Sequence, residues 1–109
     1  MVKDWIPDSG DIIWIDLNPT VGHEQSGKRP ALVLTSSSYN AATGLLLACP
    51  LTTQVKGYPF EVPVPGGGVV LADQMKCLDW RFRNARLKER APQAVVKQTQ
   101  TLLKTLLQL

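Results

Sequence analysis

Ile12-Ile13-Trp14-Ile15-Asp16-Leu17 is the stretch that decides how this chain folds. Its β-branched and aromatic residues predict a β-strand, and the turn residues Asp8-Ser9-Gly10-Asp11 lead into it. Asn18-Pro19-Thr20 ends the strand and opens a polar loop. A short apolar run at residues 31–35 follows the loop, so this part of the chain predicts two strands joined by a polar connection.

Three further apolar runs predict three more strands, at residues 45–51, 58–64 and 69–78. The turn Pro65-Gly66-Gly67-Gly68 joins the last two as a hairpin. Residues 36–44 predict a capped helical turn that ends at a glycine. Short strands separated by turns, with few helices, are typical of a small, partly open β-barrel.

The chain after Pro92 predicts a C-terminal α-helix. Proline suits the first turn of a helix, and apolar residues recur at helical spacing, at Val95, Val96, Leu102, Leu103, Leu106 and Leu107. A stripe of this kind is nearly always core, so we expect it to pack against the sheet. Asp79 predicts a capped turn through residues 80–83.

Length and composition predict one soluble, cytoplasmic domain that spans residues 1–109. The N-terminal residues lack a signal-peptide core, and no run approaches the length of a membrane span. Cys49 and Cys77 lie in apolar runs, and no Cys-x-x-Cys pair occurs beside the single histidine. We therefore expect buried free thiols and no metal site.

The charge of the chain supports a polyanionic partner only weakly. The formal net charge is +3, with a local concentration of Arg and Lys between residues 81 and 90. A basic surface attracts nucleic acid through its phosphates, but solubility alone would also explain the excess.

The polar loop is the first candidate for chemistry, because loops on a rigid sheet carry many binding and catalytic groups. It offers acceptors, donors and positive charge through His23, Glu24, Gln25, Lys28 and Arg29. An ordinary solvated connection would be polar as well. Pro30 favours extended geometry at the residue before it, which predicts that Arg29 stands at the root of the following strand.

Four blocks of the sequence, at residues 7–14, 18–30, 50–62 and 71–74, resemble the MazF/PemK toxins of bacterial toxin–antitoxin systems in order and spacing. The resemblance implies an SH3-like barrel with a C-terminal helix and a homodimer. It also implies a metal-independent endoribonuclease that needs no cofactor and cuts single-stranded RNA at a short sequence. Neutralisation by a MazE-type antitoxin is implied in the same way.

The resemblance favours the MazF-like branch of that family. The PemK-like branch carries an arginine two residues before the aspartate of its Asp-Gln motif, and Leu71 stands there in this chain. Arg29 and Thr52, the MazF-like pair, are both present. The resemblance therefore makes Arg29 and Thr52 the catalytic pair, with Asp73 and His23 as secondary candidates.

Metal-free RNA cleavage by the neighbouring 2′-OH requires alignment, stabilisation of charge on the phosphoryl oxygens and two proton transfers. The fork of Arg29 suits a phosphate, and the hydroxyl of Thr52 can donate to a phosphoryl oxygen. Arginine is a poor general base because its pKa lies above about 12. We therefore expect Glu24 or His23 to assist deprotonation, and Asp73 is also chemically suited.

Further side chains could bind RNA. Phosphate or base contacts are predicted for Gln25, Lys28, Gln54 and Lys56, and Tyr58 could stack on a splayed base. The neighbouring Phe60 is expected in the core. Structural roles remain open: Glu24 could pair with Arg29 at the surface, and Thr52 could cap a turn.

Two other functions compete with the nuclease. A CcdB-like toxin of the same barrel would act by binding a protein such as gyrase, with no need of a phosphate-directed arginine. A small RNA-binding module would bind RNA without cleaving it.

Overall fold

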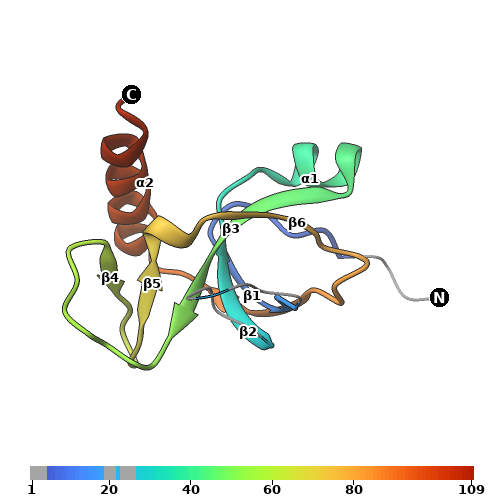
Figure 1. Ribbon diagram of the computed structural model, residues 1–109. Coiled ribbons are helices and arrows are strands. Elements are labelled where there is room, and N and C mark those ends of the chain that lie inside the picture. The colour runs from blue at the N-terminus through green and yellow to red at the C-terminus, as the bar shows by residue number, and fades with distance from the viewer. Residues whose placement is uncertain (1–4, 19–21, 23–26) are drawn as a thin grey trace.

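The computed structural model describes residues 5–18, 22 and 27–109, which fold as an antiparallel β-sheet with a C-terminal helix (Figure 1). The elements are β1 (Asp11–Asp16), β2 (Lys28–Val33), α1 (Ser37–Thr43), β3 (Leu45–Thr52), β4 (Glu61–Pro63), β5 (Val69–Leu71), the 3-10 turn η1 (Ala72–Gln74), β6 (Lys76–Asp79), β7 (Arg86–Arg90) and α2 (Gln93–Leu107). The predicted mainly β fold with a C-terminal helix is confirmed.

The strand order in the described part of the chain is β4-β5-β3-β2-β1-β7, and β6 also pairs with β3. The strands at the two ends of this order, β4 and β7, do not pair with each other, so the sheet is not closed into a barrel. The eight-residue strand β3 pairs with β2 on one edge. On the other edge it pairs first with β6 and then with β5.

Two hydrophobic clusters lie on opposite faces of β1 and β2, because neighbouring residues of a strand point to opposite faces. Ile13 and Ile15 belong to a cluster that also contains Val33, Leu46 and Trp80. Ile12 and Leu32 belong to the other, which contains Leu51, Val62, Val70 and Val95. Val96, Leu102 and Leu103 of α2 pack against the second cluster, as the helical stripe predicted. Leu106 and Leu107 were expected to pack in the same way but are exposed, because they lie in the last turn of α2, beyond the cluster.

Both predicted caps are present. Ser36 accepts a hydrogen bond from the backbone N–H of Tyr39 at the start of α1, and Gly44 ends the helix with φ +73°. Asp79 accepts a bond of 3.0 Å from the backbone N–H of Phe82. These local signals act over three or four residues, so the sequence alone reveals them.

The structure differs from the sequence prediction in three strands. The predicted strand at residues 69–78 is divided by η1, so that β5 and β6 pair with different parts of β3. The predicted strand at 58–64 shortens to Glu61–Pro63, since Pro59 has no N–H for a ladder. The strand β7 was not predicted, because all five of its residues are exposed and show no apolar alternation.

One burial prediction is right and one is wrong. Cys49 is buried in the second cluster, whereas Cys77 is exposed on β6. No helix in the part of the chain that the structure describes is long and apolar enough to cross a membrane.

Asn40 is fully buried and connects three segments. Its side-chain amide donates to the carbonyls of Pro7 (2.8 Å) and Thr35 (3.0 Å), and its backbone carbonyl accepts from Nε1 of Trp80 (2.9 Å). The hydroxyl of Thr35 donates to its Oδ1 at 2.7 Å. One side chain therefore joins the N-terminal turn to the start of the helix α1.

We expect Asn40→Ala to lower the free energy of unfolding by about 2–4 kcal/mol, because it leaves buried partners without hydrogen bonds. Urea denaturation measures the change. Gln98→Ala, on the exposed face of α2, serves as the control and should change the midpoint little. Equal midpoints for the two variants would contradict this role of Asn40.

Candidate active site

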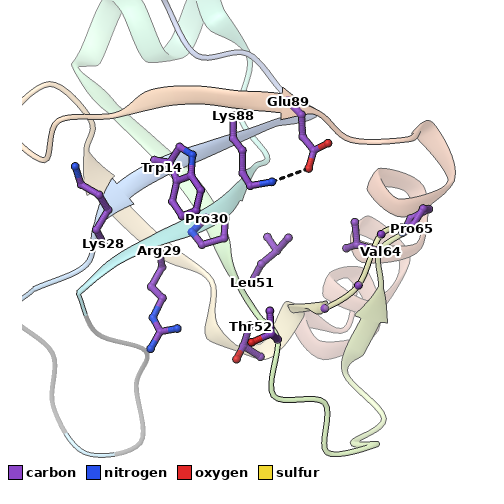
Figure 2. Close-up of a pocket in the computed structure, with 14 residues that line it drawn as sticks. Trp14, Lys28, Arg29, Pro30, Leu51, Thr52, Val64, Pro65, Lys88 and Glu89 are labelled. Carbon is purple, nitrogen blue, oxygen red and sulfur yellow. Dashed lines mark hydrogen bonds and ion pairs between the residues drawn. The ribbon is translucent and has the colours of Figure 1, made fainter.

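A cavity of about 470 Å³ lies where β1, β2, β3, β7 and the turn after β4 meet. It is lined by Trp14, Lys28, Arg29, Pro30, Leu51, Thr52, Thr53, Val64, Pro65, Gly66, Gly67, Gly68, Lys88 and Glu89. Figure 2 shows Arg29 extending from β2 and Thr52 at the end of β3, on the side of the cavity away from Lys88. The lining thus combines apolar side chains with cationic, carboxylate and hydroxyl groups.

Strand register explains why Arg29 and Thr52 line the same cavity. Ala31 of β2 pairs with Pro50 of β3 in an antiparallel ladder. Arg29 lies two residues before Ala31, and Thr52 lies two residues after Pro50. Because side chains repeat their direction every two residues, the same register sets these two positions across from each other.

The backbone that leads into Arg29 is held by the end of β1. Leu17 N–H donates to the carbonyl of Gly27 (2.9 Å), and Gly27 N–H donates to Oδ1 of Asn18 (3.0 Å). Arg29 itself pairs with Ile15 in the β1–β2 ladder and is partly buried. The Arg29 side chain therefore extends from a fixed position on β2, as the Arg29-Pro30 pair predicted.

Thr52 is 7% exposed, and its Oγ1 accepts a bond of 3.1 Å from the backbone N–H of Gln54. That bond uses an acceptor site of the hydroxyl, so the hydroxyl hydrogen can still be donated to an oxygen in the cavity. The structural role considered for Thr52, capping a turn, is therefore real and compatible with ligand binding.

A second cavity, of about 280 Å³, shares Thr52 with the first. Its other lining residues are Gln54, Lys56, Tyr58, Phe60, Glu61, Leu71, Asp73 and Gln74. Thr52 thus stands between a cavity that holds Arg29 and a cavity that holds amide, aromatic and acidic groups.

The structure brings most of the predicted site residues to these two cavities. Lys28, Arg29 and Thr52 line the first, and Thr52, Gln54, Lys56, Tyr58 and Asp73 line the second. Tyr58 is 61% exposed, and Phe60 is only partly buried and lines the second cavity instead of the core. His23, Glu24 and Gln25 lie outside the described residues.

Trp14 and Lys88 line the first cavity but were not among the predicted site residues. Trp14 is 37% exposed, although Ile13 and Ile15 on either side of it are buried. Nζ of Lys88 lies 5.7 Å from the centroid of the Trp14 ring. Trp14 could have been found from the sequence, because it is an aromatic residue on the same strand face as the polar residue Asp16. Lys88 could not, because it lies on β7, a strand that was not predicted.

Cys49 is buried in the second hydrophobic cluster and is not suited to nucleophilic chemistry. Burial, and then the negative charge of Asp73, raise the pKa of its thiol to about 12. The thiol donates to the carbonyl of Ala72 at 3.7 Å. At neutral pH the thiol stays protonated and hydrogen-bonded. Among the described residues no group of three or more His, Cys, Asp or Glu side chains could hold a metal ion.

Comparison with known proteins gives consistent matches over nearly the whole chain. Residues 8–107 match the family described as PemK-like, MazF-like toxin of type II toxin-antitoxin system. The endoribonuclease toxin MazF of Escherichia coli K12 is 54% identical over 91 residues, which cover 81% of this chain and 82% of that protein. The Escherichia coli endoribonuclease PemK is 32% identical over 90% of this chain and 80% of its own length.

Solved structures agree with this match. A crystal structure of MazF from Deinococcus radiodurans has a TM-score of 0.94 and 47% identity, and covers 97% of this chain and 100% of that chain. A MazE-MazF crystal structure from the same organism has a TM-score of 0.88 and 47% identity, and covers 97% of this chain and 99% of that chain.

Gly68, the residue before β5, lies close to the backbone of Thr52. A Cβ at Gly68 would lie 2.9 Å from the carbonyl oxygen of Thr52, and the residue has φ +87°. Gly67 has φ +111°, but a Cβ there would meet nothing within 4 Å. Substitutions at the two glycines therefore distinguish the cost of backbone strain from the cost of a clash with Thr52.

We expect Gly67→Ala to cost about 1–2 kcal/mol of stability through backbone strain alone. Gly68→Ala should cost about 1–3 kcal/mol more, because the new Cβ must displace the backbone of Thr52. Thermal unfolding of both variants measures the difference. Equal losses in the two variants would show that the Thr52 contact carries no constraint.

Proposed function

This chain belongs to the PemK-like, MazF-like toxins of type II toxin-antitoxin systems, and on that premise we propose that it is an endoribonuclease toxin that cleaves single-stranded RNA. We propose further that it cuts at a short sequence, needs no metal, and is neutralised by a MazE-type antitoxin. The observation that carries the proposal is that Arg29 and Thr52 line one cavity.

In the proposed reaction, the 2′-oxygen of a ribose attacks the adjacent phosphorus. The bond from phosphorus to the 5′-oxygen breaks, leaving a 2′,3′-cyclic phosphate and a 5′-OH. Arg29 donates two hydrogen bonds to the phosphoryl oxygens as their negative charge grows. The Thr52 hydroxyl donates to one of these oxygens, while Gln54 N–H keeps its oxygen in place.

Two protons must move in this step, one from the 2′-OH and one to the departing 5′-oxygen. We assign removal of the first to Glu24 or His23, because a carboxylate or a neutral imidazole accepts a proton readily at neutral pH. Asp73 is a further candidate for this base, and it lines the second cavity together with Thr52.

The RNA chain would pass from one cavity to the other across Thr52. Lys28 and Lys88 supply positive charge in the first cavity, and Lys56 supplies it in the second. Tyr58 is exposed enough to stack on a splayed base, and Gln54 and Gln25 offer amide groups to base edges. Trp14 adds an aromatic surface to the predicted set.

The same cavities suit an acidic, partly disordered antitoxin segment, which would fold on contact and exclude RNA. This partner is in keeping with the MazE-MazF structures from Deinococcus radiodurans.

We also propose a homodimer and a cytoplasmic location, where the RNA substrate is found. Exposed Leu106 and Leu107 on α2 offer apolar surface for a second copy.

The nuclease is preferred to the CcdB-like alternative, because the similar proteins are endoribonucleases and MazF toxins, not gyrase-binding toxins. An RNA-binding module without turnover stays as an outcome of the cleavage experiment.

The wild-type protein should cleave a mixed-sequence RNA oligonucleotide in EDTA and leave an all-2′-deoxy copy intact. Arg29→Ala should lower kcat about 100–1,000-fold by removing charge stabilisation. Thr52→Val should lower it about 10–100-fold, and Thr52→Ser, which keeps the hydroxyl, should restore most of the loss. Mass spectrometry identifies the cyclic phosphate and the cut sequence.

Lys104→Ala, which removes one positive charge from the exposed end of α2, is the matched control for Arg29→Ala. RNA that stays intact under varied sequence and salt would refute the nuclease. Binding of RNA and deoxy copy with equal affinity, without cleavage, would favour the RNA-binding module.

The rate should rise with pH as the general base loses its proton. Glu24→Gln or His23→Ala should flatten this rise, depending on which residue accepts the proton. Initial rates between pH 4 and 9 test the assignment. An unchanged rise in both variants would exclude both residues as the base.

A further inference from the structure

Residues 53–60 connect β3 to β4 without regular secondary structure. All of them are exposed except Phe60, which is partly buried. A segment with so little packing keeps one conformation only if hydrogen bonds hold it. The loop is important because it supplies Gln54, Lys56 and Tyr58 to the cavity that also contains Thr52.

The two ends of this loop are attached to neighbouring structure. At the start, Gln54 N–H donates to Oγ1 of Thr52 at 3.1 Å. At the end, the carbonyl of Phe60 accepts from the backbone N–H of Ala72 at 3.1 Å. These bonds fix where the loop begins and ends, but they leave the path of its middle open.

The middle of the loop is held by the carboxylate of Glu61, the first residue of β4. Lys56 N–H lies 3.2 Å from each carboxylate oxygen, and Gly57 N–H donates to Oε1 at 2.9 Å. Glu61 N–H in turn donates to the carbonyl of Tyr58 at 3.2 Å. Bonds from N–H groups to an ionised carboxylate are about twice as strong as those between neutral groups.

This attachment determines how two side chains are presented. The chain turns at Gly57, whose φ of +79° suits glycine. Nζ of Lys56 then lies 6.0 Å from the centroid of the Tyr58 ring. A cation beside an exposed aromatic face matches one nucleotide, with the phosphate near the ammonium group and the base stacked on the ring.

We propose that Glu61 is a positioning residue, which holds the loop 53–60 in the shape that presents Lys56 and Tyr58 to the RNA substrate. This inference rests on the proposed nuclease function. A loop that is already ordered loses less conformational entropy when RNA binds. Glu61 therefore acts on substrate binding and leaves the chemical step at Arg29 and Thr52 unchanged.

A direct contact with RNA is the rival role, because Glu61 also lines the second cavity. A carboxylate that accepted a hydrogen bond from an exocyclic amino group would select particular bases. Its loss would then change the sequence that is cut. A positioning residue changes KM for the same sequence, so the two roles predict different results.

The experiment compares wild type, Glu61→Ala and Glu61→Gln in EDTA on an RNA oligonucleotide that contains the wild-type cut sequence. Hydrogen–deuterium exchange of residues 53–60 is measured in the free proteins. Glu61→Ala should raise KM about tenfold, with kcat and the cut sequence unchanged. The amides of Lys56 and Gly57 should exchange faster. Glu61→Gln, which keeps an acceptor oxygen, should recover most of the KM.

Two further variants make the test specific. Asp73→Asn removes a negative charge from the same cavity and should leave the exchange of residues 53–60 unchanged. In a Tyr58→Ala background, Glu61→Ala should raise KM less than in wild type, because the two residues act through one loop. Unchanged exchange in the amides of β3 verifies that each variant keeps its fold.

Unchanged KM and unchanged loop exchange in Glu61→Ala, with an active wild type, would refute the positioning role. A new cut sequence in Glu61→Ala or Glu61→Gln would assign Glu61 to base recognition instead. A wild-type protein that leaves RNA intact would refute the proposed function itself, and the role in RNA binding with it.

Discussion

The pairing of β3 with three other strands is the constraint on which the rest of the structure depends. β2 occupies one edge of β3, and β6 and β5 share the other, so both edges of an eight-residue strand are used. A strand paired on both edges cannot slip by one residue without turning every side chain to the wrong face. Its last residue, Thr52, follows directly on this doubly paired segment and is itself held by its pairing with Val69 of β5.

The candidate active site combines this firm placement with loops that can vary. Arg29 and Thr52 belong to strands whose register is set by pairs of buried residues, such as Leu32 with Cys49. The residues that would contact the rest of the RNA lie mainly on loops and on the edge strand β7. Such a division would let sequence preference change through the loops while the proposed catalytic pair stays in position.

The two cavities carry different sets of charged and polar groups, although each contains at least one cation and one carboxylate. The cavity that holds Arg29 also holds Lys28 and Lys88, which attract a polyanion without choosing its sequence. The second cavity contains the carboxylate of Asp73 and the amides of Gln54 and Gln74, which can distinguish base edges. Glu61 belongs to this second group by position, but its hydrogen bonds are made to the backbone of the loop.

Local patterns in the sequence determined the features that neighbouring residues control. The caps at Ser36 and Gly44, the turn at Asp79 and the amphipathic helix α2 were all predicted, because each depends on residues only a few positions apart. The extended geometry before Pro30 and the resemblance carried by residues 18–30 and 50–62 pointed to Arg29 and Thr52 without any coordinates.

Only the tertiary structure decided which distant residues meet. The register of β2 on β3 sets Arg29 across from Thr52, and the exposed, charged strand β7 forms because β1 offers it an open edge. That edge brings Lys88 to Trp14 and leaves the indole at the cavity. These outcomes depend on long-range hydrogen-bond pairing between backbones, which side-chain patterns within a single strand do not encode.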